Sequence, residues 1–126
     1  MRHHAELLHQ HARIHEAPLD AVRDVLVKHT SRYESDQMKA IDRVMLASET
    51  LTARKQTAYA IQEEALYTTL CEVWRQPQRR PALRIVAMVS IGAMRLALEA
   101  WRHQLGERST ASILEETFAR LRSEIC

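Results

Sequence analysis

Apolar residues recur every three to four positions along most of this chain, and short polar segments interrupt the pattern. This spacing is the α-helical period, and no segment shows the alternation with period two that is typical of a strand. With 2 glycines and 3 prolines among 126 residues, long helices have few interruptions. We therefore expect an all-α fold, a bundle of about six helices. The expected segments are 2–16, 18–31, a third helix carrying Met38, Ile41, Val44, Met45 and Leu46, about 52–75, a fifth from Pro81 to Leu105, and a sixth carrying Ala111, Leu114, Phe118, Leu121 and Ile125.

The expected ends follow from residues that start or stop helices. Pro18 and Pro81 suit the first turn of a helix, where a missing backbone N–H costs nothing. The hydroxyls of "SETLT" suit a helix start near 52. Gly106 suits the left-handed conformation that often ends a helix.

The fifth predicted helix is apolar on far more than one face. At about 100° per residue, its charged residues fall in a narrow wedge, and Ser90 is the only polar residue well outside that wedge. A surface helix of a soluble protein normally has one apolar stripe, so this helix needs cover on two sides. The charged wedge consists of Arg84, Arg95, Glu99 and Arg102.

Two arrangements supply that cover: one chain wraps the helix completely, or a second copy packs on its outer side. The sixth helix has only one apolar stripe, which favours the second copy. Two such helix pairs related by a twofold axis form a four-helix bundle. We therefore predict a homodimer whose interface is built from the last two helices. The predicted interface residues are Val89, Ile91, Met94, Leu98, Trp101, Leu114, Phe118 and Leu121.

The fourth predicted helix places a carboxylate, Glu63, in the middle of an apolar stripe with Tyr59, Leu66, Leu70 and Trp74. An unpaired carboxylate on a buried face is costly. One interpretation is a polar contact in an otherwise apolar ligand cavity, with Tyr59 and Trp74 as walls. The alternatives are that Glu63 pairs with an arginine such as Arg95, or that the helix is rotated so that water reaches it. The predicted ligand contacts are Tyr59, Glu63, Leu66, Trp74, Met88 and His11.

The first predicted helix carries His4, Leu8, His11 and His15 on one face. His11 and His15, four residues apart, could share a metal ion, but the sequence offers no third ligand at a fixed spacing. We expect a polar edge of a packed helix, lining a cavity entrance or facing a neighbouring module, and predict no metal and no cofactor.

Composition narrows the class of protein. Net charge is +2, so charge alone does not indicate nucleic-acid binding. The two cysteines, Cys71 and Cys126, suggest neither a disulfide framework nor a zinc site, and the longest apolar run, about 85–94, is about half of a membrane span. No nucleophile–base pair, phosphate-binding glycine loop or HExxH pattern is present. We expect a soluble cytoplasmic protein that is not an enzyme and does not enter a membrane.

The stretches "ASETLTARKQTAYAIQEEALYTTLCEVW", "LRIVAMVSIGAMRLALEAW" and "SILEETFARLRSEI", in this order, resemble the C-terminal domain of TetR/AcrR-type transcriptional regulators. The resemblance covers residues 47–125 well and residues 5–46 loosely. It implies one domain over 1–126, with a connecting helix at 1–16, ligand-core helices at 17–78 and dimerisation helices at 79–126.

The resemblance also implies a function. Members of this family begin with a helix-turn-helix, which has no counterpart in these residues, so we expect no nucleic-acid binding by this segment. The implied role is the effector-sensing and dimerisation half of a repressor-type regulator, in which a small hydrophobic molecule controls DNA binding allosterically. The alternative is a helical homodimeric scaffold without a small-molecule ligand.

Overall fold

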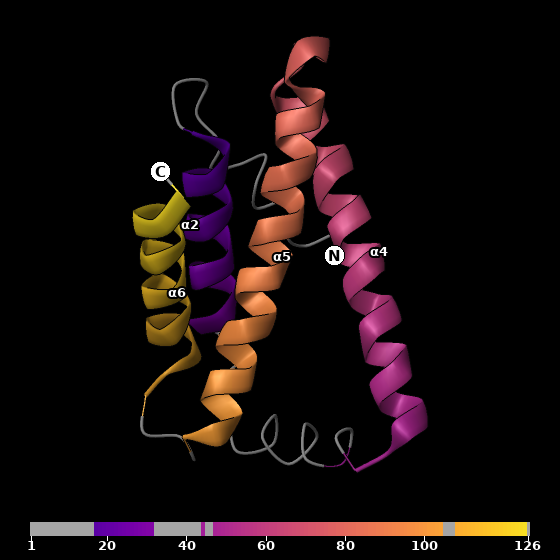
Figure 1. Cartoon of the computed structure of the whole chain (residues 1–126), viewed down its shortest axis with the longest axis vertical. Coiled ribbons are helices and arrows are strands. Elements are labelled where there is room, and N and C mark those ends of the chain that lie inside the picture. The colour runs from indigo at the N-terminus through magenta and orange to yellow at the C-terminus, as the bar shows by residue number, and fades with distance from the viewer. Residues whose placement is uncertain (1–16, 32–43, 45–46, 105–107, 126) are drawn as a thin grey trace.

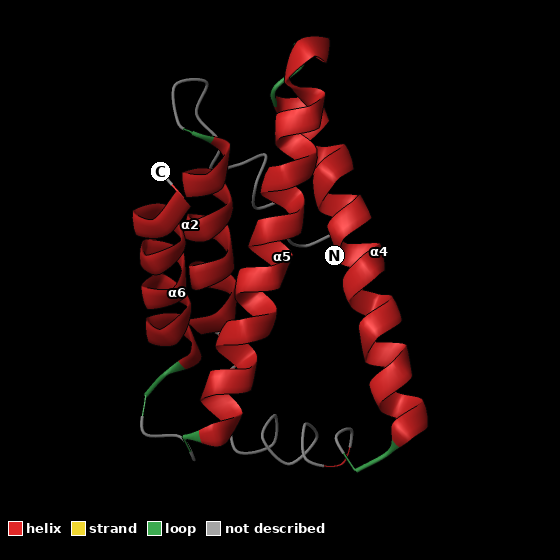
Figure 2. Ribbon diagram, in the orientation of Figure 1, coloured by secondary structure: helices red, strands yellow, loops and turns green. Residues whose placement is uncertain are grey.

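A computed structural model describes residues 17–31, 44, 47–104 and 108–125. These residues form helices and connecting turns without any strand, which confirms the predicted all-α fold (Figure 2). The predicted helix over 2–16 lies outside the described residues, and of the third predicted helix only Val44 is described, so the count of six stays a prediction. The helices are α2 (Pro18–Ser31), α4 (Glu49–Val73), the 3₁₀ helix η1 (Pro77–Arg79), α5 (Arg80–His103) and α6 (Thr110–Ile125).

The helix ends agree with most of the sequence signals. α2 begins at Pro18, and α5 carries Pro81 in its first turn, as expected. α4 begins at Glu49 rather than near 52, so part of the "SETLT" segment is helical. α5 ends at His103, before the predicted Leu105, and the backbone N–H of Gln104 donates to the carbonyl of Ala100. Gly106 lies outside the described residues.

α5 is the central helix of the described structure. α2 and α6 lie side by side on one flank of α5, and α4 lies on the other flank (Figure 1). α4 and α5 run antiparallel, are close near their connection and separate toward the start of α4. α5 therefore packs on three helices of its own chain.

The core lies on the side of α5 that faces these three helices. Its smallest members are Ala21 of α2 and Ala87, Ala93 and Ala97 of α5, which allow the helix backbones to approach closely. The buried apolar residues are Ala21, Val22, Val25, Leu26, Leu66, Leu70, Trp74, Leu83, Ala87, Ile91, Ala93, Met94, Ala97, Trp101, Ile113, Leu114 and Phe118.

The side of α5 that faces away from the core is not covered by the described chain. Ile85, Met88 and Leu96 are 57%, 52% and 60% exposed, and Val89 and Gly92 between them are half-buried. A Cβ atom added at Gly92 would meet nothing within 4 Å. We call these five residues the outer α5 stripe. The prediction that one chain leaves part of this helix uncovered is therefore confirmed for the described residues.

The helix that contains this stripe is also long and apolar enough, by length and composition alone, to cross a membrane. The apolar run at about 85–94 therefore gave too short a measure of this apolar segment, which extends over Pro77–His103. In the structure α5 packs on three other helices and carries Arg84, Arg95, Glu99 and Arg102, which is typical of the core helix of a globular domain.

Ionic contacts join α2 to α6 at the surface. Arg122 of α6 forms an ion pair with Asp20 of α2, and Arg23 lies 3.7 Å from the same carboxylate. The pair of Asp20 with Arg122 joins residues about a hundred positions apart in sequence, and the contact of Arg23 with the same carboxylate lies within α2. The Asp20–Arg122 pair fixes the ends of the two helices against each other, while the buried apolar residues supply most of the stability.

Candidate functional site

The predicted ligand stripe of α4 divides into a buried part and a half-buried part. Leu66, Leu70 and Trp74 are buried among the core residues. Glu63 and Tyr59, about one and two turns before Leu66, are half-buried. The structure thus places one end of the stripe in the core and the other at its edge.

The ring of Tyr59 lies near two cations. The guanidinium of Arg95 lies 5.7 Å from the centre of its ring, and the ammonium of Lys55 lies 6.0 Å from it. A cation over an aromatic face at this distance is attracted by the electron-rich ring. Arg95 also lies 3.9 Å from Glu99, one turn further along α5. Tyr59 therefore contacts α5 through its ring.

Glu63 does not pair with Arg95, which was one of the alternatives. Among the described residues Glu63 has no hydrogen bond or ion pair, although its charge acts on Arg84 and helps to raise the pKa of that guanidinium. Its half-buried position agrees with partial access of water. Its role as a ligand contact stays a prediction.

Arg84 joins α5 to α4 in a cluster that the sequence did not indicate. Its guanidinium donates to Glu64 at 2.6 Å and lies 3.9 Å from the centre of the Tyr67 ring. The hydrogen bond from Arg84 lowers the pKa of Glu64, and the same bond raises the pKa of Arg84. The pKa of Tyr67 is raised, first by its hydrogen bond with the Cys71 thiol and then by burial. Arg84 lay in the predicted charged wedge, but the spacing of residues gave no sign of its partner.

This ion pair predicts a small acid sensitivity. The folded pKa of Glu64 lies below its unfolded value, so the pair stabilises the fold above the ordinary glutamate pKa, about 4.3, and this contribution is lost as pH falls through the folded value. We expect the melting temperature of Glu64→Gln to fall less than that of the wild type between about pH 5 and pH 3. The neighbouring Glu63→Gln is the control and should keep the wild-type slope; equal slopes for Glu64→Gln and wild type would contradict the prediction.

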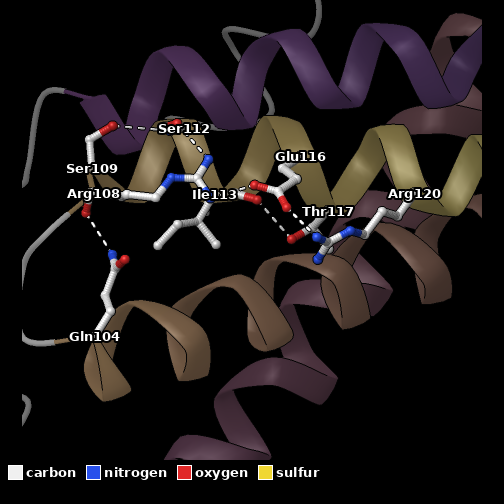
Figure 3. A network of polar contacts seen from close by, with 8 residues as sticks. All are labelled: Gln104, Arg108, Ser109, Ser112, Ile113, Glu116, Thr117 and Arg120. Atoms are coloured by element: carbon white, nitrogen blue, oxygen red, sulfur yellow. Dashed lines mark hydrogen bonds and ion pairs between the residues drawn. The ribbon is translucent and has the colours of Figure 1, made fainter.

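The connection between α5 and α6 carries a second polar network (Figure 3). The hydroxyl of Ser109 accepts the backbone N–H of Ser112 at 3.1 Å, which caps the start of α6. Arg108 donates to the Ser112 hydroxyl at 2.9 Å and pairs with Glu116, which also pairs with Arg120. Arg108 and Arg120 lower the pKa of Glu116. The side chain of Gln104 donates to the Arg108 carbonyl at 2.7 Å, so the network also joins the start of α6 to the end of α5.

The eight residues predicted for a dimer interface lie at different depths in the protomer. Ile91, Met94, Trp101, Leu114 and Phe118 are buried in the core of a single chain. The other three, Val89, Leu98 and Leu121, are half-buried. The sequence pattern shows that a residue is on an apolar face, but it does not show which helix covers that face. The interface itself stays a prediction.

The remaining predicted ligand contacts lie elsewhere. Met88 is on the outer α5 stripe and more than half exposed, away from the buried end of the α4 stripe. His11, with the neighbouring His15, lies outside the described residues. The described part of the chain contains no group of three residues able to hold a metal ion.

Comparison with known families shows what kind of domain these helices form. Residues 16–125 match the model of the MftR C-terminal domain, a C-terminal domain of the TetR type. The chain belongs to this family. No curated protein matches the chain in the corresponding comparison. The TetR-type assignment supports an effector-binding and dimerisation domain of a regulator, and such domains typically dimerise and bind small molecules.

Proposed function

We propose that this TetR-type domain senses a small hydrophobic effector and forms a homodimer, and that it belongs to a soluble cytoplasmic regulator of the repressor type. The observation that carries the proposal is the outer α5 stripe in a domain of this family: Ile85, Met88 and Leu96 remain exposed on a helix that is otherwise the centre of the core. Exposed apolar groups gathered on one helix face mark an interaction surface.

A second copy is the partner that fits this stripe. A twofold axis brings the same face of each copy together, so three large exposed side chains from each chain become covered. Full burial of such a side chain contributes about 1.5–3 kcal/mol, and these three are 52–60% exposed, so each contributes roughly half of that. Gly92 lies in the middle of the stripe with open space above it, which lets a second α5 approach closely there. Of the residues predicted from sequence, Val89 lies within this face.

The effector site that we propose uses the half-buried end of the α4 stripe. Tyr59 offers an aromatic ring and Glu63 a carboxylate, beside the buried side chain of Leu66. Effector binding there controls a DNA-binding helix-turn-helix only if the effector favours one arrangement of the helices over another. α5 connects the two functions, because Arg95 contacts Tyr59 and adjoins Leu96 of the outer stripe.

A thermal-shift screen tests the effector-binding function. We expect at least one compound of a panel of small hydrophobic molecules to raise the melting temperature by several degrees, since a ligand at a hundred times its Kd stabilises the native state by about 2.7 kcal/mol. Glu63→Gln and Tyr59→Ala should reduce the shift, and Ile61→Ala, on the exposed side of α4, is the control. A folded dimer that no compound stabilises would instead support the scaffold without a ligand.

A further inference from the structure

Two buried polar atoms of the described chain have no hydrogen-bond partner although they lie close to the proposed effector site. They are the side-chain oxygen Oε1 of Gln62 in α4 and the hydroxyl Oγ of Ser90 in α5. Ser90 is completely buried. A buried polar group without a partner loses its hydration and gains nothing in return, so such groups are rare in folded proteins.

The helix contacts place the two groups at the same height. α4 and α5 are antiparallel, and the Tyr59–Arg95 and Tyr67–Arg84 contacts fix their register. Gln62 lies between the two tyrosines and Ser90 lies between the two arginines, so both fall within the segment that these contacts bracket.

The two groups also lie on the same side of the helix pair. At about 100° per residue, Gln62 lies roughly 100° and Ser90 roughly 130° around its helix from the middle of the face that makes these contacts. Because the helices are antiparallel, the two rotations bring both groups to one side. This is the inner side, since Ser90 lies on the far side of α5 from the exposed Ile85 and Leu96.

The buried neighbours of these groups are apolar and uncharged. Leu66 lies one turn after Gln62, and Ala87 and Met94 lie one turn before and after Ser90; all three are buried. The buried polar residues of the described chain are Thr69, Ser90 and Thr110, none of which ionises. A charged ligand group would lose its hydration here without meeting a buried counter-ion.

We propose that Gln62 and Ser90 form a polar subsite that binds a neutral hydrogen-bonding group of the effector, such as a hydroxyl. A serine hydroxyl donates and accepts, and a glutamine amide does both through its two ends. One hydroxyl held between them satisfies both groups, while the apolar neighbours contact the hydrocarbon part. This inference rests on the proposed effector-binding function and adds the chemical class of the ligand's polar end.

Three probes of equal chain length test the subsite: 1-octanol, octanoate and octylamine, each titrated by calorimetry and thermal shift at pH 7. We expect 1-octanol to bind most tightly, and Ser90→Ala and Gln62→Met each to weaken its binding about fivefold to tenfold, the cost of one hydrogen bond. The control is Thr69→Val, because Thr69 is also buried but its hydroxyl already donates to the Ala65 carbonyl at 3.1 Å. This variant should bind 1-octanol as the wild type does.

The unliganded variants give an independent readout. Ser90→Ala removes a buried hydroxyl without a partner, so we expect its melting temperature to equal or exceed that of the wild type. A lower melting temperature would show that the hydroxyl is already bonded and would overturn the inference.

The other outcomes separate the subsite from the effector-binding function. Tighter binding of octanoate or octylamine, or unchanged 1-octanol affinity in both variants, overturns the subsite and leaves effector binding intact. If other compounds of the hydrophobic panel bind and 1-octanol does not, the subsite is again wrong. If neither the probes nor the panel bind, both proposals fail together.

Discussion

Leu96→Glu yields a folded monomer. Leu96 is 60% exposed in the protomer, so a glutamate at this position remains in water and the chain folds as before. In the proposed dimer the same carboxylate is buried near its symmetry mate, and burying charges without partners costs several kcal/mol. We expect the dimer to weaken at least a hundredfold, as measured by sedimentation equilibrium, with little change in the melting temperature extrapolated to low protein concentration.

Ile61→Glu is the matched control for this prediction. Ile61 is 62% exposed on α4 and lies outside the outer α5 stripe. Its replacement by glutamate likewise exchanges an apolar side chain for a carboxylate. This variant should remain a dimer. Dimerisation of Leu96→Glu with wild-type affinity, or loss of the dimer in Ile61→Glu, would show that another surface holds the two copies together.

Met94→Glu, two residues away on the same helix, has a different expected result: the chain does not fold. Met94 is 7% exposed and faces the core, where no buried cation is present among the described residues. Burial of an unpaired carboxylate costs several kcal/mol, a large share of the 5–15 kcal/mol that stabilises a typical domain. Circular dichroism should show loss of helix or aggregation at neutral pH.

Met94→Leu keeps an apolar side chain of similar volume and should cost less than about 1.5 kcal/mol in a urea titration. The comparison separates the depth of burial from the presence of a charge. If Met94→Glu instead gives a well-folded monomer, Met94 lies in the dimer interface, as the sequence alone predicted, and not in the protomer core.

The sequence was sufficient for the described helices because helical periodicity and stop signals are local. Pro18 and Pro81 mark the starts of α2 and α5 within a residue or two, and the apolar stripe of α6 matches its buried face in Leu114 and Phe118. These features depend on neighbours three or four positions away, which the sequence displays directly.

The sequence was insufficient where the answer depends on contacts between distant segments. The excess of apolar surface on α5 was visible, but the choice of inner and outer residues was not: Ile91 and Met94 face the chain's own core, whereas Ile85 and Leu96 face outward. That choice depends on how α2, α4 and α6 surround α5.

The candidate site was only partly predictable from the sequence for the same reason. Glu63 was visible as a carboxylate on an apolar stripe. The hydrogen bond from Arg84 goes instead to Glu64, the residue after Glu63, because of how α4 and α5 are aligned. Ser90 gave only a weak signal, as a polar residue within an apolar helix, and Gln62 gave none. Their lack of hydrogen-bond partners is a property of the packed structure.

The central claim is that a second copy covers the outer flank of α5, and the mass of the wild-type protein in solution tests it most directly. Sedimentation equilibrium of the 126-residue chain, 14.6 kDa, at low micromolar concentration should give twice that mass. A folded species of the single-chain mass that persists at tens of micromolar would contradict the claim.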